Sequence, residues 1–373
     1  YCTRLLADFG AEVIKVQSAE IGRAESVPGY NNYYNRNKLG VSIDMSTEKG
    51  REICKRLISV SDVVVENFSA RVLRQWGLDW ENARKIRPDI IVVSMAGMGH
   101  SGPMRDYVSF GPTLHAMTGL TSLGSFSRER PLGYGYSYAD HVGGITGAMG
   151  VLQALNFRLR TGQGQFVDVA QLEGTAALLS TALLECTING KPPGPIGNRL
   201  HNPAATPHDV YPCKGVDRWV AITVFSEEEW RSFCGVVGEV SWLSDSRFAT
   251  ALSRRQNADE LDKLISEWTR RHTAEEVMGL LQRAGVPAGV VQDAEDLIEH
   301  DPQIKARGFW VEADHPEAGK TRLDRSPINF SETPFQVQRA APLPGQHNNY
   351  VFGEILGMSA EEIARLTEEG VLQ

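Results

Sequence analysis

A single carboxylate, Asp140, has the clearest potential for chemistry in this chain, because it opens a segment that is rich in glycine. It is the only acidic residue between positions 136 and 155, and small residues follow it among apolar ones at helical spacing. These small residues are Gly143, Gly144, Gly147, Ala148 and Gly150. A helix lined in this way lets another backbone or a bulky ligand come close. Asp140 is then either an N-cap or a carboxylate nucleophile held against a large acyl substrate, and the segment alone leaves both open.

The second candidate is the glycine-rich segment at residues 97–102, GMGHSG, which follows a predicted strand. Its spacing formally fits the GxGxxG fingerprint of dinucleotide-binding proteins. However, Pro103 follows at once, no helix pattern opens there, and no acidic residue stands at a strand end about 20 positions further on. The segment therefore predicts a loop whose backbone passes close to some ligand, and it does not predict NAD binding.

Other common catalytic patterns are missing from the sequence. The histidines show neither HxxxH nor HExxH spacing and the five cysteines form no CxxC pair, so no metal site is predicted. No serine stands in a GxSxG elbow, and Cys213 lies in an apolar strand entry that favours packing over reactivity. Arg36 and Lys38, in YYNRNK, either bind an anion or are ordinary surface charges.

Composition limits the class of protein. The 38 basic and 46 acidic residues give a net charge of −8 without long blocks of one sign, which disfavours a nucleic-acid partner. No apolar run approaches the roughly 20 residues that span a bilayer, so no membrane partner is predicted. The scattered cysteines indicate free thiols and a cytoplasmic location. Because the chain starts with a helix pattern where an α/β chain normally has a strand, we expect a short preceding piece.

The first 100 residues alternate helix and strand patterns, which predicts a parallel sheet with helices on both faces. Ligands in such folds bind beyond the carboxyl ends of the strands, where Asn67, Phe68 and residues 97–102 are expected. Many glycines and prolines between residues 189 and 212 predict a domain boundary. We therefore expect a large domain at residues 1–190, a smaller α/β domain at 191–325, and a segment at 326–373 that returns to the large domain.

Several segments resemble, in the same order along the whole chain, the class III coenzyme A transferase family, which includes formyl-CoA and carnitine CoA transferases. These segments are YCTRLLADFGAEVIKV, NRNKLGVSIDM, SDVVVENF, RPDIIVVSMAGMGHSGP, SYADHVGGITGAMGVLQAL, RTGQGQFVDVAQLEG, GNRLHNPAATPHDVYPCK and AGVPAGVV. The resemblance implies a Rossmann-like large domain and a smaller domain in an interlocked homodimer. It also implies a CoA thioester as substrate, with no permanently bound cofactor.

The resemblance also implies roles for individual residues. Asp140 matches the family nucleophile, and Asn67 and Phe68 match a segment that contacts coenzyme A. Lys38 matches a basic position near the nucleotide phosphates. The predicted coenzyme A contacts also include Gly97, Met98 and Gly99. The family commonly has an arginine where this chain has Gln75, so Arg71 or Arg74 must supply that charge.

The family mechanism implies that Asp140 attacks the thioester carbonyl of an acyl-CoA and then carries coenzyme A as an aspartyl thioester until a second acid accepts it. Gly143 and Gly144 would offer backbone N–H groups to the developing oxyanion. Tyr138 and His141 are candidates for orienting the acid. Where formyl-CoA transferases carry a lid with a run of glycines, this chain has GNRLHNP at residues 197–203, which favours a larger acid.

Two alternatives remain at this stage. The α-methylacyl-CoA racemases of the same family pair the aspartate with a His-Asp dipeptide, where this chain has Ser109-Phe110-Gly111. Racemisation needs a base on each face of the α-carbon, and His115 is the available substitute. The other alternative is a non-catalytic acyl-CoA-binding protein. The sequence as a whole predicts a CoA transferase acting between an acyl-CoA and a free carboxylic acid.

Overall fold

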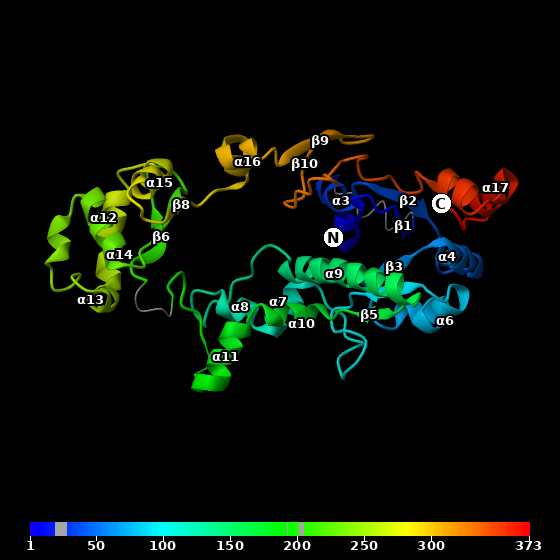
Figure 1. The fold of residues 1–373 in the computed structure, drawn as a ribbon, viewed down its shortest axis with the longest axis horizontal. Helices are drawn as coiled ribbons and strands as arrows, with labels where there is room; N and C mark the ends of the chain where they lie inside the picture. Colours follow the sequence, from blue (N-terminus) through cyan, green and yellow to red (C-terminus); the bar gives the residue numbers. More distant parts are fainter. Residues whose placement is uncertain (19–27, 192, 201–204) are drawn as a thin grey trace. The chain divides into compact units, whose positions relative to one another are not determined.

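The structure is a computed structural model that describes residues 1–18, 28–191, 193–200 and 205–373 (Figure 1). The chain forms two compact units. The first comprises Tyr1–Thr121, Gly133–Pro193 and Pro302–Gln373, and the second comprises Ser122–Leu132 and Gly194–Asp301. The small domain that we predicted, residues 191–325, thus extends beyond the end of the second unit, and the chain re-enters the first unit at Pro302.

Parallel strands form the framework of the first unit. β1 (Val13–Gln17) pairs with β2 (Lys38–Ser42), and β4 (Ile91–Ser94) lies between β3 (Val63–Glu66) and β5 (Phe166–Asp168). The apolar runs of β2 and β4 are buried along their whole length, as expected of parallel strands covered on both faces. The mixed α/β class with parallel sheets is therefore confirmed. Within the described residues the strands form two separate parallel sheets, where we expected one.

The helices of the first unit largely follow the sequence signals. Thr47 caps α4 by accepting a bond from the Gly50 N–H, and Ser359 caps α17 by accepting one from the Glu362 N–H. Two separate helices, α10 and α11, follow β5. The helices are α1 (Cys2–Ala7), α3 (Pro28–Asn35), α4 (Glu48–Val60), α5 (Val72–Trp76), α6 (Trp80–Ile86), α7 (Gly111–Thr118), α8 (Leu120–Leu123), α9 (Tyr138–Thr161), α10 (Gln171–Ala177), α11 (Ser180–Asn189), α16 (Pro302–Ala306), η3 (Asn349–Ile355) and α17 (Ala360–Glu368).

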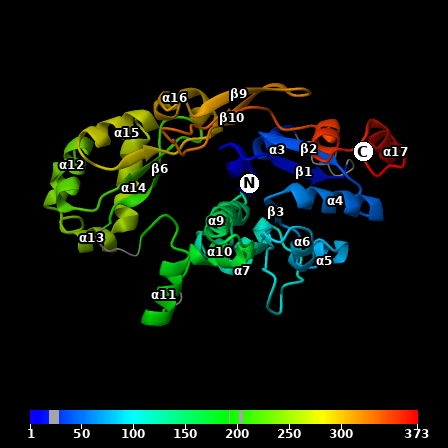
Figure 2. The ribbon, with the colours of Figure 1, turned by 45° about the vertical axis from the view of Figure 1, so that its right-hand side comes forward.

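Helix α9 is the longest of these and lies beside α7 and α10 in both views (Figures 1 and 2). Its small residues allow very close packing. A Cβ atom on Gly143 would lie 2.8 Å from Cγ of Gln171 in α10, and one on Gly144 would lie 2.9 Å from Cβ of Tyr1. A Cβ atom on Gly147 would overlap the sulfur of Met95, which follows β4. The glycine pattern in the sequence therefore marks the face on which neighbouring elements pack.

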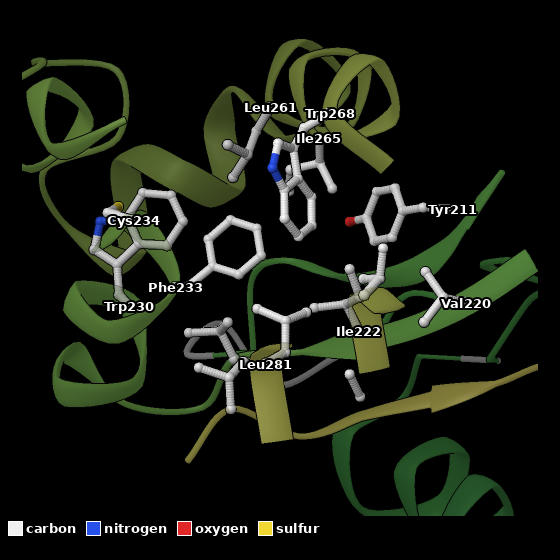
Figure 3. Close-up of a cluster of buried hydrophobic side chains, with 14 of the residues drawn as sticks. Tyr211, Val220, Ile222, Trp230, Phe233, Cys234, Leu261, Ile265, Trp268 and Leu281 are labelled. Carbon is white, nitrogen blue, oxygen red and sulfur yellow. The ribbon is translucent and has the colours of Figure 1, made fainter. Parts of the chain in front are cut away.

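The second unit has an antiparallel sheet in the order β6 (His208–Pro212), β7 (Trp219–Thr223), β8 (Ala288–Val290). Capping boxes start three of its helices, at Ser226, Thr250 and Thr273. Its apolar core includes stacked aromatic rings from Trp230 and Phe233 (Figure 3). Its helices are α12 (Glu227–Val237), η1 (Val240–Leu243), α13 (Ala251–Gln256), α14 (Ala258–Thr269), α15 (Ala274–Arg283) and η2 (Asp296–His300).

The segment after Pro302 contains an antiparallel hairpin, formed by β9 (Trp310–His315) and β10 (Gly319–Asp324). A buried charge network ties this hairpin to the start of the chain. Arg36 bonds both carboxylate oxygens of Asp8 at 2.6 and 2.9 Å, and it also pairs with Asp324 at 2.9 Å. Arg4 pairs with Asp324 at 2.6 Å. Two arginines thus neutralise two aspartates in a site where Arg4, Arg36 and Asp8 are almost inaccessible to solvent.

We predict that Arg36→Met destabilises the first unit by about 3–5 kcal/mol, because it leaves two buried carboxylates with one arginine. Lys49→Ala is the matched control, since the Lys49–Glu369 pair, at 2.6 Å, also joins distant parts of the first unit but is exposed. Its loss should cost no more than about 1 kcal/mol. Urea unfolding followed by circular dichroism measures both. Equal losses for the two variants would contradict the prediction.

No helix in the described part of the chain is both long and apolar enough to cross a membrane.

Candidate functional site

Asp140 lies in the first turn of α9 and is exposed. The N-cap of α9 is Ser137, three residues earlier, and its side chain makes no capping bond to the helix backbone. Instead, the Ser137 hydroxyl donates to Oδ2 of Asp140. Asp140 is therefore not the N-cap that the sequence left open. It is an exposed carboxylate near the positive end of a helix of 24 residues, with one oxygen held by a hydroxyl.

Gly111, the first residue of α7, packs directly against this carboxylate. A Cβ atom at this position would overlap the Ser137 hydroxyl and lie 3.0 Å from Oδ2 of Asp140. Any larger residue here would push the Ser137 and Asp140 side chains away from α7. In the sequence, Gly111 stands out only as part of a missing racemase motif, because contact across two helices leaves no signal in a single segment.

His115 bonds to the backbone of the same helix, α9. It lies on α7, is 3% exposed, and its Nε2 atom accepts a hydrogen bond of 3.1 Å from the backbone N–H of Ala139. This bond satisfies one of the N–H groups that the first turn of any helix leaves without an internal partner. The Nε2 lone pair is thus occupied, and His115 is a support for α9 in this structure. A role as a second base would require that bond to break.

His141, the residue after Asp140, is bonded to groups other than the carboxylate. Its Nδ1 atom lies 2.9 Å from the carbonyl oxygen of Ser137, and its Nε2 atom lies 2.6 Å from the Tyr136 hydroxyl and 3.1 Å from the Tyr34 hydroxyl. These residues belong to a chain of aromatic contacts that we call the tyrosine cluster. Its members are Tyr1, Tyr30, Tyr33, Tyr34, Tyr136 and Tyr138, together with the His141 ring.

The phenols bonded to His141 remain neutral over a wide pH range. Burial, followed by the neighbouring Tyr33, raises the pKa of Tyr136 to about 12. Burial also raises the pKa of Tyr34 well above its ordinary value, with further contributions from neighbouring tyrosines and from the charge of Asp140. Both hydroxyls are therefore hydrogen-bond donors at neutral pH. The Tyr34 hydroxyl lies 3.1 Å from Nε2 of His141, which places it next to the first turn of α9.

A second polar group lies where the three strands β3, β4 and β5 end. Their last residues, Glu66, Ser94 and Asp168, are register partners across the sheet. His100, in the glycine-rich loop, joins them. Its ring Nε2 is 2.6 Å from the Ser94 hydroxyl and 3.8 Å from Oε1 of Glu66, and its backbone N–H donates to Asp168 at 3.0 Å. These bonds fix residues 97–102 onto the carboxyl ends of the strands.

The same network reaches the segment predicted to contact coenzyme A. Oε2 of Glu66 accepts a bond of 2.6 Å from the backbone N–H of Phe68. Asn67 and Phe68 are exposed, and the Phe68 ring packs edge-on against Trp76. Arg71, the N-cap of α5, and Arg74 within it are also exposed. Gly97, Met98 and Gly99 belong to the loop that His100 anchors, so most of the predicted contacts share one edge of the sheet.

We predicted no role for Ser94, His100 or Asp168 from the sequence, and Glu66 entered only as part of the SDVVVENF motif. The available signal was positional, since Glu66, Ser94 and Asp168 each stand at the end of an apolar strand pattern.

Lys38 is placed differently from the other predicted contacts. It is the first residue of β2, is 5% exposed, and donates a bond of 3.1 Å to Oδ1 of Asn35. Burial, followed by repulsion from Lys15, lowers its pKa to about 7. Its contact with a phosphate stays a prediction. Of the predicted lid at residues 197–203, positions 201–203 lie outside the described residues.

Gly143 and Gly144 are the sixth and seventh residues of α9. In a regular helix the N–H groups at these positions bond to carbonyl oxygens one turn earlier. The structure gives both glycines a packing role against Gln171 and Tyr1. Their predicted role as oxyanion donors stays a prediction, and it would require the first turns of α9 to open.

Metal ligands do not gather in the part of the chain that the structure describes, where no group of three or more His, Cys, Asp or Glu side chains is suited to hold an ion.

The chain is similar to known proteins along its whole length. Residues 1–348 match the model of CoA-transferase family III. A succinyl-CoA–D-citramalate CoA-transferase from Chloroflexus aurantiacus is 33% identical over 100% of this chain and 94% of its own length. A succinate–glutarate CoA-transferase from Agrobacterium fabrum is 31% identical over 94% of this chain and 90% of its own. A crystal structure of a CAIB/BAIF family protein from Brucella suis, 29% identical, superposes with a TM-score of 0.87 over 94% of each chain.

Proposed function

Because the chain belongs to CoA-transferase family III, we propose that it moves coenzyme A from an acyl-CoA to a free carboxylic acid through a covalent intermediate on Asp140. The observation that carries the proposal is the exposed Asp140 carboxylate, held by Ser137 and fitted against Gly111 at the start of α9. An exposed carboxylate whose orientation is fixed by a neighbouring helix is suited to attack a thioester carbonyl. The coenzyme A thioester is a substrate in this scheme.

The steps follow from the chemistry of the carboxylate. An Asp140 oxygen attacks the thioester carbon, the C–S bond breaks, and a mixed anhydride and free CoA thiolate form. The thiolate then attacks the Asp140 carbonyl, releasing the first acid and leaving an aspartyl-CoA thioester. A second carboxylate reverses these steps. The thioester energy stays in the covalent intermediate, provided that water is excluded from it.

We further propose that coenzyme A binds at the carboxyl ends of β3 and β4. The exposed residues there are Asn67, Phe68, Arg71 and Arg74, with the anchored backbone of residues 97–99 beside them. Arginine guanidinium groups suit the phosphates of coenzyme A, and the exposed Phe68 ring suits contact with an adenine base. This placement agrees with the general rule for ligands of parallel sheets.

For the acids, we propose dicarboxylates, with succinyl-CoA as donor. The two relatives named above act, by their names, on succinyl-CoA and on succinate. A dicarboxylic acid also agrees with the departure from the glycine-run lid, which favours acids larger than formate. A cytoplasmic location stays a prediction.

Replacing Asp140 by Asn should lower the transfer rate by at least about 1,000-fold, because an amide is a poor nucleophile. Glu173→Gln, an exposed acid on the adjacent helix α10, is the matched control and should keep the rate of the unchanged enzyme. The rates are measured with succinyl-CoA and a panel of dicarboxylic acids. Mass spectrometry of the working enzyme should also find a coenzyme A adduct that hydroxylamine converts to a hydroxamate at Asp140. Full activity of the Asn variant would refute the covalent mechanism.

The racemase alternative is disfavoured by the structure, because His115 is buried and its lone pair accepts the Ala139 N–H. We expect no deuterium incorporation at the α-carbon of a 2-methylacyl-CoA incubated in heavy water without an acid acceptor. Nuclear magnetic resonance of the recovered thioester measures the exchange. Exchange above background that disappears in His115→Phe, but persists in Glu173→Gln, would establish the racemase function.

We also propose that the enzyme is a homodimer, with the exposed apolar faces of α9 and α11 covered by the second copy. Ile145, Met149 and Leu152 are 48–58% exposed on α9, and Leu183 and Ile188 are 52% and 75% exposed on α11. Exposed apolar residues gathered on the surface of a helix mark an interaction surface. The interlocked arrangement is part of this proposal.

Sedimentation velocity should give the mass of a dimer for the unchanged protein. Met149→Glu combined with Leu152→Glu should shift it toward the monomer, because charges would have to enter the apolar contact. The exposed pair Glu361→Gln and Glu368→Gln on α17 serves as the control, because it changes the net charge by the same amount, two units. A dimer that survives the α9 double substitution places the interface elsewhere.

A further inference from the structure

Two phenol hydroxyls lie within hydrogen-bond distance of Nε2 of His141, but the neutral ring can accept a full hydrogen bond from only one of them. Its Nδ1 atom lies 2.9 Å from the Ser137 carbonyl oxygen, which can only accept, so Nδ1 carries the hydrogen. In the neutral ring, Nε2 then has one lone pair. The Tyr136 hydroxyl, at 2.6 Å, is closer to it than the Tyr34 hydroxyl, at 3.1 Å. Tyr34 therefore makes the weaker bond to His141, and its hydroxyl is the one that can donate to a better acceptor instead.

The Tyr34 ring is also well fixed. It contacts the rings of Tyr30 at 4.6 Å, Tyr33 at 4.7 Å and His141 at 5.7 Å. A hydroxyl on a ring held from several sides loses little freedom when it bonds a ligand, which is the condition for a preorganised donor. Its neighbour along the network, His141, follows Asp140 directly and is held to the same first turn of α9.

We propose that Tyr34 is a catalytic residue whose hydroxyl donates a hydrogen bond to the acyl oxygen of the substrate at Asp140, with Tyr136 occupying His141 so that Tyr34 can exchange its weaker bond to His141 for this one. The proposal rests on the covalent mechanism above. The Tyr34 hydroxyl would act as the oxyanion donor. The N–H groups of Gly143 and Gly144 do not offer one in this geometry, because they are bonded within the helix.

The balance of the step is simple. As an Asp140 oxygen forms its bond to the thioester carbon, the carbonyl π pair moves onto the acyl oxygen, which becomes an oxyanion bonded by the Tyr34 O–H. The pair returns as the C–S bond breaks and the thiolate leaves. The phenol hydrogen stays on Tyr34 throughout, in keeping with the raised pKa of this group. A donor aimed at the position where charge develops lowers the barrier more than it strengthens binding of the ground state.

Tyr34→Phe should lower kcat by about 100-fold, the lower end of the range for loss of an oxyanion donor, while KM for the acyl-CoA changes less than about twofold. Formation of the coenzyme A adduct in a single turnover should slow by the same factor. Tyr350→Phe is the matched control, since it removes a hydroxyl that lies 3.4 Å from Glu12 and outside the tyrosine cluster. An unchanged kcat in Tyr34→Phe, with the adduct still formed on Asp140, would overturn the proposal and leave the covalent mechanism intact.

Tyr136 provides a second test that does not depend on the effect of a single variant. In Tyr136→Phe the His141 lone pair is left to Tyr34, so kcat should fall, by less than in Tyr34→Phe. The double variant should match Tyr34→Phe alone, because the two hydroxyls act through one acceptor. Multiplying effects would instead show that the two residues act independently, and would overturn the shared-acceptor argument.

A third measurement separates a chemical role from a structural one. Replacing Tyr34 by 3-fluorotyrosine keeps the ring and hydroxyl but makes the phenol a stronger hydrogen-bond donor. The adduct should then form faster than in the unchanged enzyme, with KM unchanged. A rate equal to or below that of the unchanged enzyme would contradict donation to the oxyanion. If neither the unchanged enzyme nor any variant forms an adduct with any donor, the covalent mechanism itself fails.

Discussion

The close approach of α9 to its neighbours is the constraint on which the site depends. Three glycines on this helix meet Gln171 of α10, Tyr1 and the sulfur of Met95 at distances that leave no space for a side chain. Gln171 in turn donates a bond of 2.7 Å to the Met95 carbonyl, so α9, α10 and the end of β4 are held as one body. A carboxylate in the first turn of such a helix keeps a fixed position relative to the strand ends, which is what a reaction between two bound molecules requires.

The polar side chains around the first turn of α9 each have a different hydrogen-bond partner. His115 satisfies a helix N–H, Ser137 holds the carboxylate, and His141 is occupied by a carbonyl oxygen and a phenol. The Asp140 carboxylate stays exposed, and apart from Ser137 the polar side chains around it are bonded to other groups. This arrangement favours a reactive acid over a structural one, because a carboxylate that serves only to stabilise a helix is normally bonded to its backbone.

Elsewhere in the first unit, buried charged residues differ in whether they have an oppositely charged partner. Arg4 and Arg36 are paired with two aspartates. Lys38 is equally buried, but its bonded partner is a neutral amide oxygen, and desolvation lowers its pKa to about 7. A phosphate close to Lys38 would restore its charge, since an anion favours the protonated ammonium. Its suitability for coenzyme A therefore depends on the ligand itself.

The sequence by itself determined the class of fold, most strand positions, the carboxylate at the start of the glycine-rich helix and the family. These depend on local periodicity, on capping residues such as Thr47 and Ser359, and on the order of short motifs. Only the tertiary structure decided that Ser137 and not Asp140 stands at the N-cap, that His115 supports α9, that Lys38 is buried, and that Glu66, Ser94, Asp168 and His100 meet. Those outcomes depend on contacts between elements far apart in the chain, which leave no periodic trace in either segment. The pairing of Tyr34 with Tyr136 on one imidazole is of the same kind, because a shared lone pair exists only after α3 and α9 have packed together.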